Sequence, residues 1–360
     1  MTRSADLLVV GAGIAGLSSA LCAAERGLRV IVCDEARPGA ASGAAAGVLA
    51  PSIDGLPPDV ESFAIAARDH YPAYLDRLHR RTGIAVPLDR NGILQVASSE
   101  RALHLLGARA SGTSELLDQP ALERLEPALA AHPGAVLHPC DGAVDNVVLM
   151  EALGLAIARE PSIRRVNEAV AEIDLRGSCP VAHTRAGLQL EGACVLLAAG
   201  TWANGIRGLP RHLPVRPLRG QLARLDCAPF RHVVFAAGGY LVTRGASLLI
   251  GATSDEAGFD NGTSDEGLTA LRAIASATLA SLDGAAVLGH WAGLRPVTPD
   301  ALPILGADPE CPALVYACGF SRNGILLAPW AAEQLAPLLS GAPAPVTIAS
   351  FKVSRFGLVQ

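Results

Sequence analysis

Residues 6–34 read DLLVVGAGIAGLSSALCAAERGLRVIVCD, which is the strongest structural signal in the chain. The apolar run Asp6–Val10 predicts a strand, the apolar spacing of Ile14–Arg26 predicts a helix, and Arg29–Cys33 predicts a second strand. The pattern G-x-G-x-x-G separates the first strand from the helix, and an acidic residue follows the second strand. This order of elements predicts a Rossmann-like nucleotide-binding unit.

Each glycine of the turn has its own steric role. Gly11 permits the tight turn, Gly13 lets the backbone approach a pyrophosphate, and Gly16 lets the helix pack on the strand. The free N–H groups and the dipole of a helix N-terminus attract phosphate. Ile14 and Ala15, at the start of the helix, are therefore candidate cofactor contacts together with the glycines.

The acidic residue after the second strand is Asp34. A carboxylate there can accept hydrogen bonds from the adenosine ribose and would repel a 2′-phosphate, so NADP is disfavoured. FAD and NAD share this fingerprint. The sequence has no second such motif, which favours one flavin that meets donor and acceptor directly. Cys194–Trp202, CVLLAAGTW, resembles the second strand and glycine turn of many FAD oxidoreductases.

Composition excludes several other functions. The 29 Lys and Arg residues against 34 Asp and Glu residues give a formal net charge of −5, so we expect no nucleic-acid partner. Lys352 is the only lysine, which excludes a P-loop and pyridoxal chemistry. The eight cysteines form no C-x-x-C pair, so no metal site is predicted. The uncharged run Leu7–Ala24 contains three glycines, and we expect a cytoplasmic protein without membrane insertion.

The 360 residues suggest about two domains of roughly 150 residues each. Nucleotide-binding character at both ends, with β-rich segments between, predicts that one domain interrupts the other. Further helices are predicted at Val60–Thr82, Gln119–Leu125, from Asp145 to Arg159, at Ser264–Leu282 and at about Gly324–Leu339, and further strands at Gly92–Ala97, Ala169–Leu175, Val181–Thr184, Cys194–Ala199, Val233–Val242, Ser247–Ala252 and Ala313–Cys318.

Eight blocks together resemble the D-amino-acid oxidase superfamily, and the glycine oxidases most closely. The resemblance implies a mixed α/β (α+β) fold in which a Rossmann-like FAD-binding domain is interleaved with an antiparallel-sheet substrate domain. It assigns residues 1–83, 139–213 and 288–360 to the former and residues 84–138 and 214–287 to the latter. The blocks are VVGAGIAG at 9–16, SGAAAGVLAP at 42–51, LLAAGTW at 196–202, PVRPLRGQ at 214–221, YLVTR at 240–244, GAT at 251–253, WAGLRPVTPDALPILG at 291–306 and RNGILLAP at 322–329.

The resemblance also assigns roles to individual residues. Arg295 matches the arginine that pairs with the substrate carboxylate, and Tyr240 matches the tyrosine that hydrogen-bonds it. Arg322 matches a residue beside both the substrate and the flavin, at the loop and helix start beneath the pyrimidine ring. The remaining residues implied to contact FAD are Ser42, Ala45, Gly47, Val170, Gly200, Trp202, Asn323, Gly324, Ile325 and Leu326.

The implied reaction transfers hydride from the α-carbon of glycine, or of a small D- or N-methyl amino acid, to N5 of non-covalently bound FAD. The imine hydrolyses to a 2-oxo acid and ammonia, and O₂ re-oxidises the flavin to give hydrogen peroxide. The implied partners are the amino acid, O₂ and further copies of the chain in a dimer or tetramer. The implied pathway is thiamine biosynthesis.

Two alternatives stay open. A sarcosine-type oxidase or a quinone-linked D-amino-acid dehydrogenase would share fold and cofactor, whereas a non-enzymatic or NAD-binding protein would use only the first motif. Gly319–Ser321 resembles sarcosine oxidases, whose covalent-flavin cysteine would fall at Gly293. Glycine oxidases commonly carry histidine where this chain has Phe320, and can carry histidine and methionine at Gly238 and Ser254, so we expect a wider pocket. His290 is expected to be structural.

Overall fold

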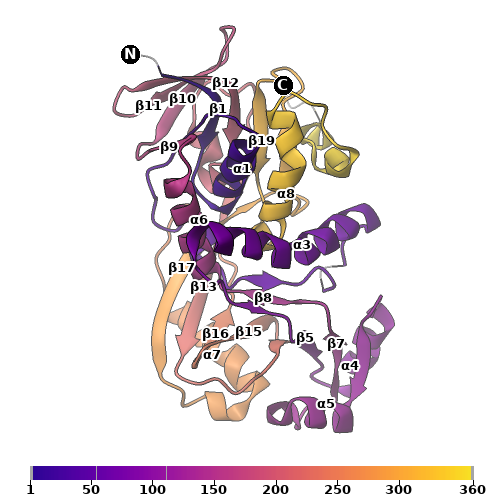
Figure 1. Ribbon diagram of the computed structural model, residues 1–360. Coiled ribbons are helices and arrows are strands. Elements are labelled where there is room, and N and C mark those ends of the chain that lie inside the picture. Colours follow the sequence, from indigo (N-terminus) through magenta and orange to yellow (C-terminus); the bar gives the residue numbers. More distant parts are fainter. Residues whose placement is uncertain (1–2, 54, 111, 358–360) are drawn as a thin grey trace.

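The computed structural model describes residues 3–53, 55–110 and 112–357. Figure 1 shows an upper and a lower part of the molecule, each built around a sheet. The upper part contains both ends of the chain, and the lower part is made only of internal segments. One part therefore interrupts the other along the chain, as the sequence predicted.

The first sheet has the order β10-β11-β12-β1-β2-β9, and β19 and β18 extend it beyond β12. The strands from β9 through β2, β1 and β12 to β19 are parallel, whereas β10, β11 and β18 join antiparallel. Their bounds are β1 Arg3–Val10, β2 Val30–Cys33, β9 Ile163–Val166, β10 Val170–Asp174, β11 Val181–Thr184, β12 Gln189–Leu197, β18 Ile304–Ala307 and β19 Leu314–Cys318.

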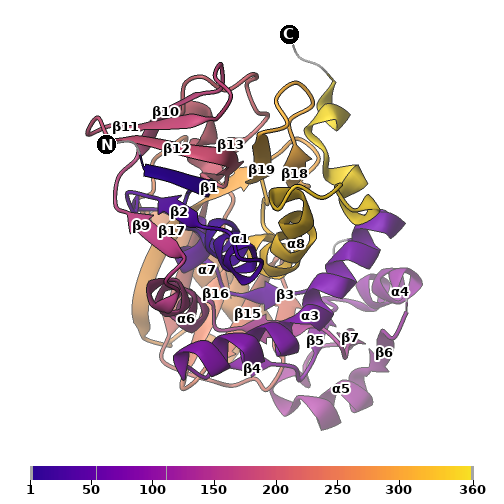
Figure 2. The ribbon, with the colours of Figure 1, turned by 45° about the horizontal axis from the view of Figure 1, so that its top comes forward.

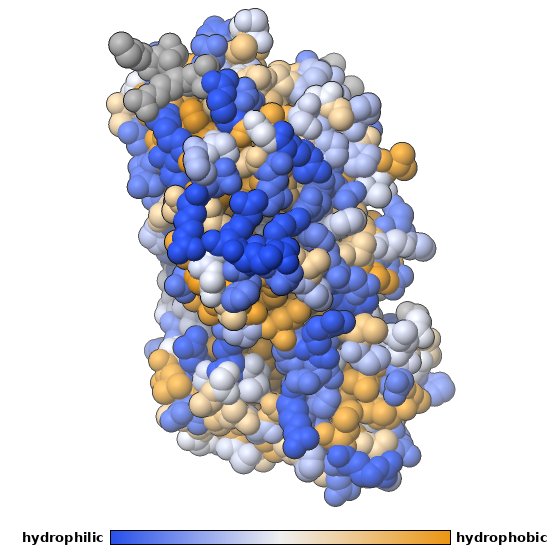
Figure 3. Space-filling model, in the orientation of Figure 1, coloured by the Kyte–Doolittle hydropathy of each residue, from blue (hydrophilic) through white to orange (hydrophobic). Residues whose placement is uncertain are grey.

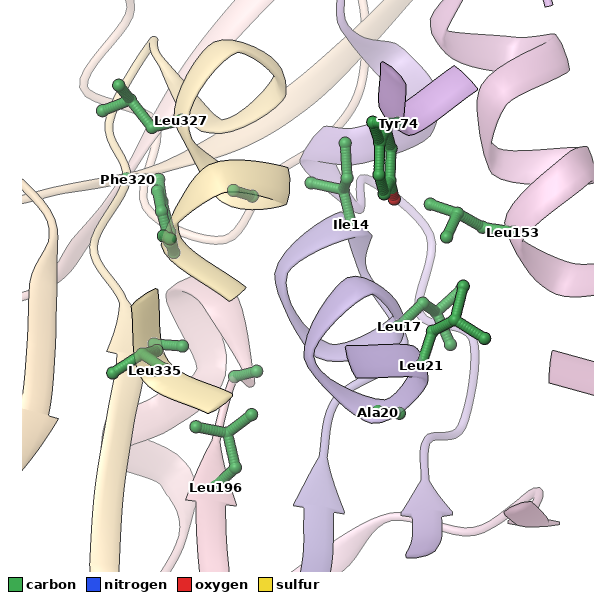
Figure 4. Packing of buried hydrophobic residues seen from close by; sticks show 14 of the residues in the cluster. Ile14, Leu17, Ala20, Leu21, Tyr74, Leu153, Leu196, Phe320, Leu327 and Leu335 are labelled. Atoms are coloured by element: carbon green, nitrogen blue, oxygen red, sulfur yellow. The ribbon is translucent and has the colours of Figure 1, made fainter. Parts of the chain in front are cut away.

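Four helices form a layer on one face of this sheet. α1 (Ile14–Glu25) packs beside α8 (Gly324–Leu339), and α3 (Pro58–Thr82) and α6 (Asn146–Arg159) pack against them (Figure 2). Figure 4 shows Ile14 of α1 facing Tyr74 of α3 within the shared hydrophobic cluster. Because β1 is buried on both faces and α1 lies directly on it, the turn between them is held rigidly at the sheet edge.

The second sheet has the order β17-β13-β16-β15-β14-β5-β7-β6 and is antiparallel except between β14 and β5. Helix α7 packs against β13, β14, β15 and β16, and α4 and α5 pack at β7. The bounds are β5 Ile93–Val96, β6 Glu115–Asp118, β7 Gly134–His138, β13 Arg216–Leu225, β14 Val233–Ala236, β15 Gly239–Arg244, β16 Ser247–Gly251, β17 Val287–Val297, α4 Glu100–Arg109, α5 Gln119–Leu125 and α7 Asp265–Thr278.

Short elements connect the two parts. A three-stranded sheet pairs β8 with β3 and β4, and so joins the segment after α2 to the segment before α6. These elements are α2 Ala41–Ala44, β3 Val48–Leu49, β4 Leu88–Asp89 and β8 Gly142–Val144, and the 3₁₀ turns are η1 Pro127–Leu129, η2 Gly200–Gly205, η3 Ala280–Leu282, η4 Val346–Phe351 and η5 Val353–Phe356. The architecture confirms the predicted mixed α/β class.

Predicted elements differ from the structure at several points; the strand expected over Cys194–Ala199, for instance, is β12, Gln189–Leu197. The strand expected over Val233–Val242 is a hairpin, because Ala237 and Gly238 both have positive φ and turn the chain between β14 and β15. The helix expected to reach Leu282 ends at Thr278, where Leu279 becomes extended before a 3₁₀ turn. Strand β17 pairs with β13 over its whole length, so residues 288–297, assigned by resemblance to the FAD-binding part, belong to the second sheet.

The molecular surface is mixed in character. Figure 3 shows hydrophilic residues spread over the face seen in Figure 1, with hydrophobic groups gathered mainly in the lower part. Within the described ranges, no helix combines the length and the apolar character that a membrane crossing requires. The large apolar side chains with the most exposure are Leu105, Leu116, Val147, Phe259, Leu288 and Val346.

Candidate active site

A continuous cavity of about 1520 Å³ is lined by residues of both sheets. This exceeds the roughly 300–1,000 Å³ that a single small-ligand pocket usually has. One end is lined by the β1–α1 turn, the end of β2 and residues 198–202. The other end is lined by β13, β15 and β17 of the second sheet and by the loop before α8. The cavity therefore has room for an extended cofactor and a second, smaller molecule.

The structure brings almost all of the predicted site residues together around this cavity. Gly16 and Leu326 are the exceptions: Gly16 packs against the Gly11 carbonyl group, and Leu326 lies in the hydrophobic core. The predicted residues that line the cavity are Gly11, Gly13, Ile14, Ala15, Asp34, Ser42, Ala45, Gly47, Val170, Gly200, Trp202, Tyr240, Arg295, Arg322, Asn323, Gly324 and Ile325.

The glycine turn is shaped by close backbone contacts. Gly11 has φ +109°, and a Cβ atom there would collide with the Ala198 carbonyl group. The Gly11 amide donates to the Cys33 carbonyl at 2.8 Å, which ties the turn to the end of β2. The Ile14 amide, at the start of α1, donates to Ser42 Oγ at 3.0 Å. The turn therefore presents its backbone to the cavity.

Asp34 is oriented by the same turn. One carboxylate oxygen accepts a hydrogen bond from the Ala12 amide at 2.8 Å, and the other accepts from the Ala36 amide at 2.9 Å. Nearby, Arg37 lies over the Trp202 ring, with its guanidinium carbon 5.5 Å from the ring centroid. An acceptor, a cation and an aromatic ring thus border the end of the cavity that the motif assigns to adenosine.

Residues 41–47 are all alanine, glycine or serine, and they form one wall of the cavity. Gly47 has φ +76°, and a Cβ atom there would collide with the Val144 carbonyl group. Arg244 Nη2 donates to the carbonyls of Ala46, at 2.8 Å, and Val144, at 3.2 Å, while its Nη1 pairs with Asp145 at 2.8 Å.

Two further side chains hold this wall. Trp291 Nε1 donates to the Ala44 carbonyl at 2.9 Å, and Asn146 Nδ2 donates to the Ser42 carbonyl at 3.0 Å. Sequence reasoning did not single out Arg244, Trp291 or Asn146 as site residues. Arg244 and Trp291 do lie in the YLVTR and WAGLRP blocks, and the family resemblance of these blocks is the sequence feature that could have pointed to them. The wall is therefore fixed by side chains from distant elements.

We expect Arg244→Met to raise the dissociation constant for FAD about 30-fold. The substitution removes hydrogen bonds from a charged donor, worth about 2 kcal/mol, and leaves Asp145 without that partner. FAD affinity is measured by ultrafiltration of the purified protein at graded dilution. Arg176→Met is the matched control, since that arginine pairs with Asp174 and its side chain is 87% exposed. Equal FAD affinity in the two variants would contradict this role.

Tyr240 and Arg295 meet at the other end of the cavity, and two glycines make room for them. A Cβ atom at Gly220 would collide with the Arg295 guanidinium, and one at Gly251 would collide with the Tyr240 ring. Arg295 Nη1 donates to the Thr253 carbonyl at 3.0 Å. The strands β13 and β16 thus provide a flat floor on which the two side chains lie.

The electrostatics of this pair favour an anion. Burial raises the pKa of the Tyr240 phenol above its usual value, and the adjacent Arg295 guanidinium only partly offsets that effect. The phenol therefore stays protonated and can donate a hydrogen bond beside a permanent positive charge. A planar carboxylate can accept from both groups at once.

The loop before α8 completes the cavity. The Ser321 amide donates to the Pro296 carbonyl at 3.0 Å, which ties the loop to the strand that carries Arg295. The Tyr71 hydroxyl donates to the Ile325 carbonyl and so holds the first turn of α8. The helix runs from Gly324 to Leu339, and its N-terminus, which carries partial positive charge, lies at the cavity wall.

Several other positions near the cavity were candidates for a chemical role. Cys33 and Cys318 line it, but burial raises the pKa of both thiols to about 12, so both stay protonated. Gly293, where a covalent-flavin cysteine would fall, is buried against Ala44. Burial lowers the pKa of His290, which does not line the cavity. The structure therefore gives these groups no evident chemical role.

The lining fits a flavin dinucleotide. The glycine turn lines the cavity, and Gly11 itself has no room for a side chain against the Ala198 carbonyl group. Thr201 borders the cavity, and its hydroxyl is buried without a hydrogen-bond partner among the described residues. A buried polar atom of this kind indicates a missing partner. The glycine turn, the Asp34 carboxylate and the Thr201 hydroxyl together provide contacts for a nucleotide.

Comparison with known proteins gives the family. Glycine oxidase from Pseudomonas putida is 32% identical over 359 residues, with 95% of this chain and 98% of that protein covered. The crystal structure of glycine oxidase from Geobacillus kaustophilus has a TM-score of 0.91 at 31% identity, covering 98% of this chain and 99% of that one. Iminodiacetate oxidase from Chelativorans sp. has a TM-score of 0.87 at 25% identity, covering 96% and 98%. Residues 6–338 match the DAO family model, described as FAD dependent oxidoreductase, and the chain therefore belongs to this family.

Proposed function

We propose that this FAD-dependent oxidoreductase oxidises the amine of glycine or of a small substituted glycine, and that Arg295 and Tyr240 bind the substrate carboxylate. The observation that carries the proposal is the pairing of a guanidinium with a protonated phenol in the same cavity as the glycine turn. The similarity to glycine oxidases supports the same substrate class.

Each residue has a definite task in this proposal. The Arg295 fork and the Tyr240 hydroxyl hold the carboxylate, which fixes the α-carbon and its hydrogen at one place. FAD, when bound, supplies the acceptor for the hydride that leaves the α-carbon. The N-terminus of α8 stabilises negative charge that develops beside it. Overall, a primary amino acid, O₂ and water give a 2-oxo acid, ammonia and hydrogen peroxide, whereas an N-methyl amino acid releases methylamine in place of ammonia.

Proton transfer in the substrate needs no side chain in this scheme. Within the described cavity lining there is no histidine or lysine, and the acidic residues Asp34 and Glu35 belong to the adenosine end. The amine therefore binds in its neutral form after losing a proton to solvent. The protonated thiols of Cys33 and Cys318 also support non-covalent FAD. Acid precipitation should release all FAD into the supernatant.

We expect D-alanine, D-proline or sarcosine to match or exceed glycine in kcat/KM. Gly238 and Ser254 both line the cavity, and they are small where glycine oxidases can carry histidine and methionine. Each methylene group buried in the added space contributes about 0.8 kcal/mol. The similarity to iminodiacetate oxidase, which is named for an N-substituted glycine, supports a site that accepts more than glycine.

Steady-state peroxide assays on the four substrates test this expectation. Ser254→Met refills the space and should shift the preference toward glycine, while Ser254→Thr, a smaller change, should shift it less. A preference of the wild-type protein for glycine above about tenfold, or ~1.4 kcal/mol, would contradict the wider pocket. Peroxide formed in equal amount to the O₂ consumed supports oxygen as the acceptor, in place of a quinone.

A further inference from the structure

We propose that Thr253 is a positioning residue for substrate binding: its carbonyl group fixes the Arg295 guanidinium, and Asp255 and Gln221 fix Thr253. The inference rests on the proposed role of Arg295. Thr253 directly follows the cavity residue Ala252 and precedes Ser254, but does not itself line the cavity. It therefore acts from behind the site, through Arg295.

Thr253 is held at three points. Its amide donates to the Gln221 carbonyl at 3.2 Å. Its hydroxyl accepts from the Gln221 amide at 3.0 Å and donates to Asp255 Oδ2 at 2.9 Å. Its carbonyl accepts from Arg295 Nη1 at 3.0 Å. With amide and hydroxyl both engaged, the carbonyl has little freedom to move.

A second layer holds these partners in place. The Gln221 side chain is buried, its Nε2 donates to Asp255 Oδ2 at 2.9 Å, and its Oε1 accepts from the Ser264 amide at 2.9 Å. The backbones of Arg219 and Asp255 exchange two hydrogen bonds, at 2.9 and 3.0 Å. Gly267 leaves the space that the Gln221 amide occupies. The layer therefore ties the residues after β16 to β13 and to the start of α7.

The consequence for Arg295 follows from the shape of its guanidinium. The group is planar, and one edge is bound to the Thr253 carbonyl while its face lies over Gly220. A planar group fixed along one edge and on one face presents its other donors in a set direction. Carboxylate binding by a guanidinium fork depends on that direction, because two parallel hydrogen bonds must form together. Releasing the Thr253 carbonyl should therefore weaken substrate binding without removing any group that touches the substrate.

A pair of substitutions isolates the hydroxyl. Thr253→Val keeps the shape, the carbonyl and the backbone bond to the Gln221 carbonyl, but loses the two hydroxyl bonds, to Asp255 Oδ2 and to the Gln221 amide. Thr253→Ser keeps both hydroxyl bonds. We expect Thr253→Val to raise KM for the preferred amino acid, and Kd for a carboxylate inhibitor, about tenfold, with kcat within about twofold. Thr253→Ser should restore KM to within about twofold of wild type. Thr243→Val is the matched control in the same sheet, because it removes a 2.8 Å hydroxyl bond to the Phe230 carbonyl that does not involve Arg295.

A double-mutant cycle with Arg295→Met separates this inference from the proposed function. If Thr253 acts through Arg295, Thr253→Val should have no further effect on inhibitor Kd in the Arg295→Met protein. An equal tenfold effect in both backgrounds, or no effect in either, would overturn the positioning role. A normal Kd in Arg295→Met itself would instead overturn the proposed carboxylate site. FAD content and Tm report whether a variant is merely misfolded, and inhibitor binding is then compared only among variants with full FAD.

Discussion

Arg295→Ala is expected to lower kcat/KM for the amino acid at least ~30-fold while FAD remains bound. The substitution leaves the substrate carboxylate in the cavity without its cationic partner, and losing one member of a hydrogen-bonded charge pair costs on the order of 2–5 kcal/mol. Arg295 lies on β17 of the second sheet and donates to the Thr253 carbonyl, and it takes no part in the hydrogen bonds described for the glycine turn, so FAD content should be unchanged. Peroxide assays give kcat/KM, and the visible spectrum gives FAD content.

Arg295→Lys is the informative companion variant. Lysine keeps the positive charge but lacks the planar fork, so we expect its kcat/KM to lie between those of wild type and Arg295→Ala. Alkylamines without a carboxylate should be oxidised equally poorly by all three proteins. Wild-type kinetics in Arg295→Ala would remove this residue from the substrate site.

Gly11→Ala is expected to abolish stable FAD binding. The added Cβ atom would collide with the Ala198 carbonyl group, and φ +109° is a conformation that alanine rarely adopts. Strain of this kind costs about 1–3 kcal/mol, and the collision adds to it by moving the turn that faces the cofactor. We therefore expect the FAD dissociation constant to rise at least 100-fold, or ~2.7 kcal/mol, and the protein to lose its yellow colour on gel filtration.

Gly27→Ala is the control that introduces backbone strain away from the cofactor-binding turn. Gly27 also has positive φ, +82°, but a Cβ atom there meets nothing within 4 Å. This variant should lose some thermal stability and keep its FAD. A Gly11→Ala protein that retains one FAD per chain through gel filtration would contradict the assignment of the turn to the cofactor.

Local sequence patterns predicted six of the eight strands that the described residues form in the first sheet, because these six are apolar runs separated by clear turns, whereas β9 and β18 were missed. In the β1–α1–β2 unit, α1 and β2 were predicted to within one residue and β1 starts three residues before its predicted start, since burial on both faces makes β1 and β2 apolar runs. The hairpin at Ala237 and Gly238 was missed because these small residues do not interrupt the apolar run that precedes Tyr240. Strands β13 and β17 were missed because arginines and glycines break their apolar pattern.

The site was predictable only where a motif marks it. Gly11, Asp34 and Arg295 stand in recognisable blocks, and each lines the cavity. Arg244 contacts the Ala46 carbonyl 198 positions away in the chain, and Thr253 contacts Arg295 at a separation of 42. Each of these two contacts joins an arginine side chain to a backbone carbonyl, whose position depends on the folded chain and not on the type of side chain at that residue. The YLVTR and GAT blocks contain Arg244 and Thr253, but a block does not say which backbone atoms its residues contact.

The central claim is that the cavity selects an amine by its carboxylate. Anaerobic mixing of the holoprotein with glycine, sarcosine or D-alanine, and separately with methylamine or ethylamine, tests this most directly when the absorbance of oxidised FAD is followed. We predict that at least one amino acid removes this absorbance at least 100 times faster than its amine counterpart, and that adding O₂ restores it with one hydrogen peroxide per FAD. Reduction by the simple amines at the same rate as by the amino acids would contradict the account.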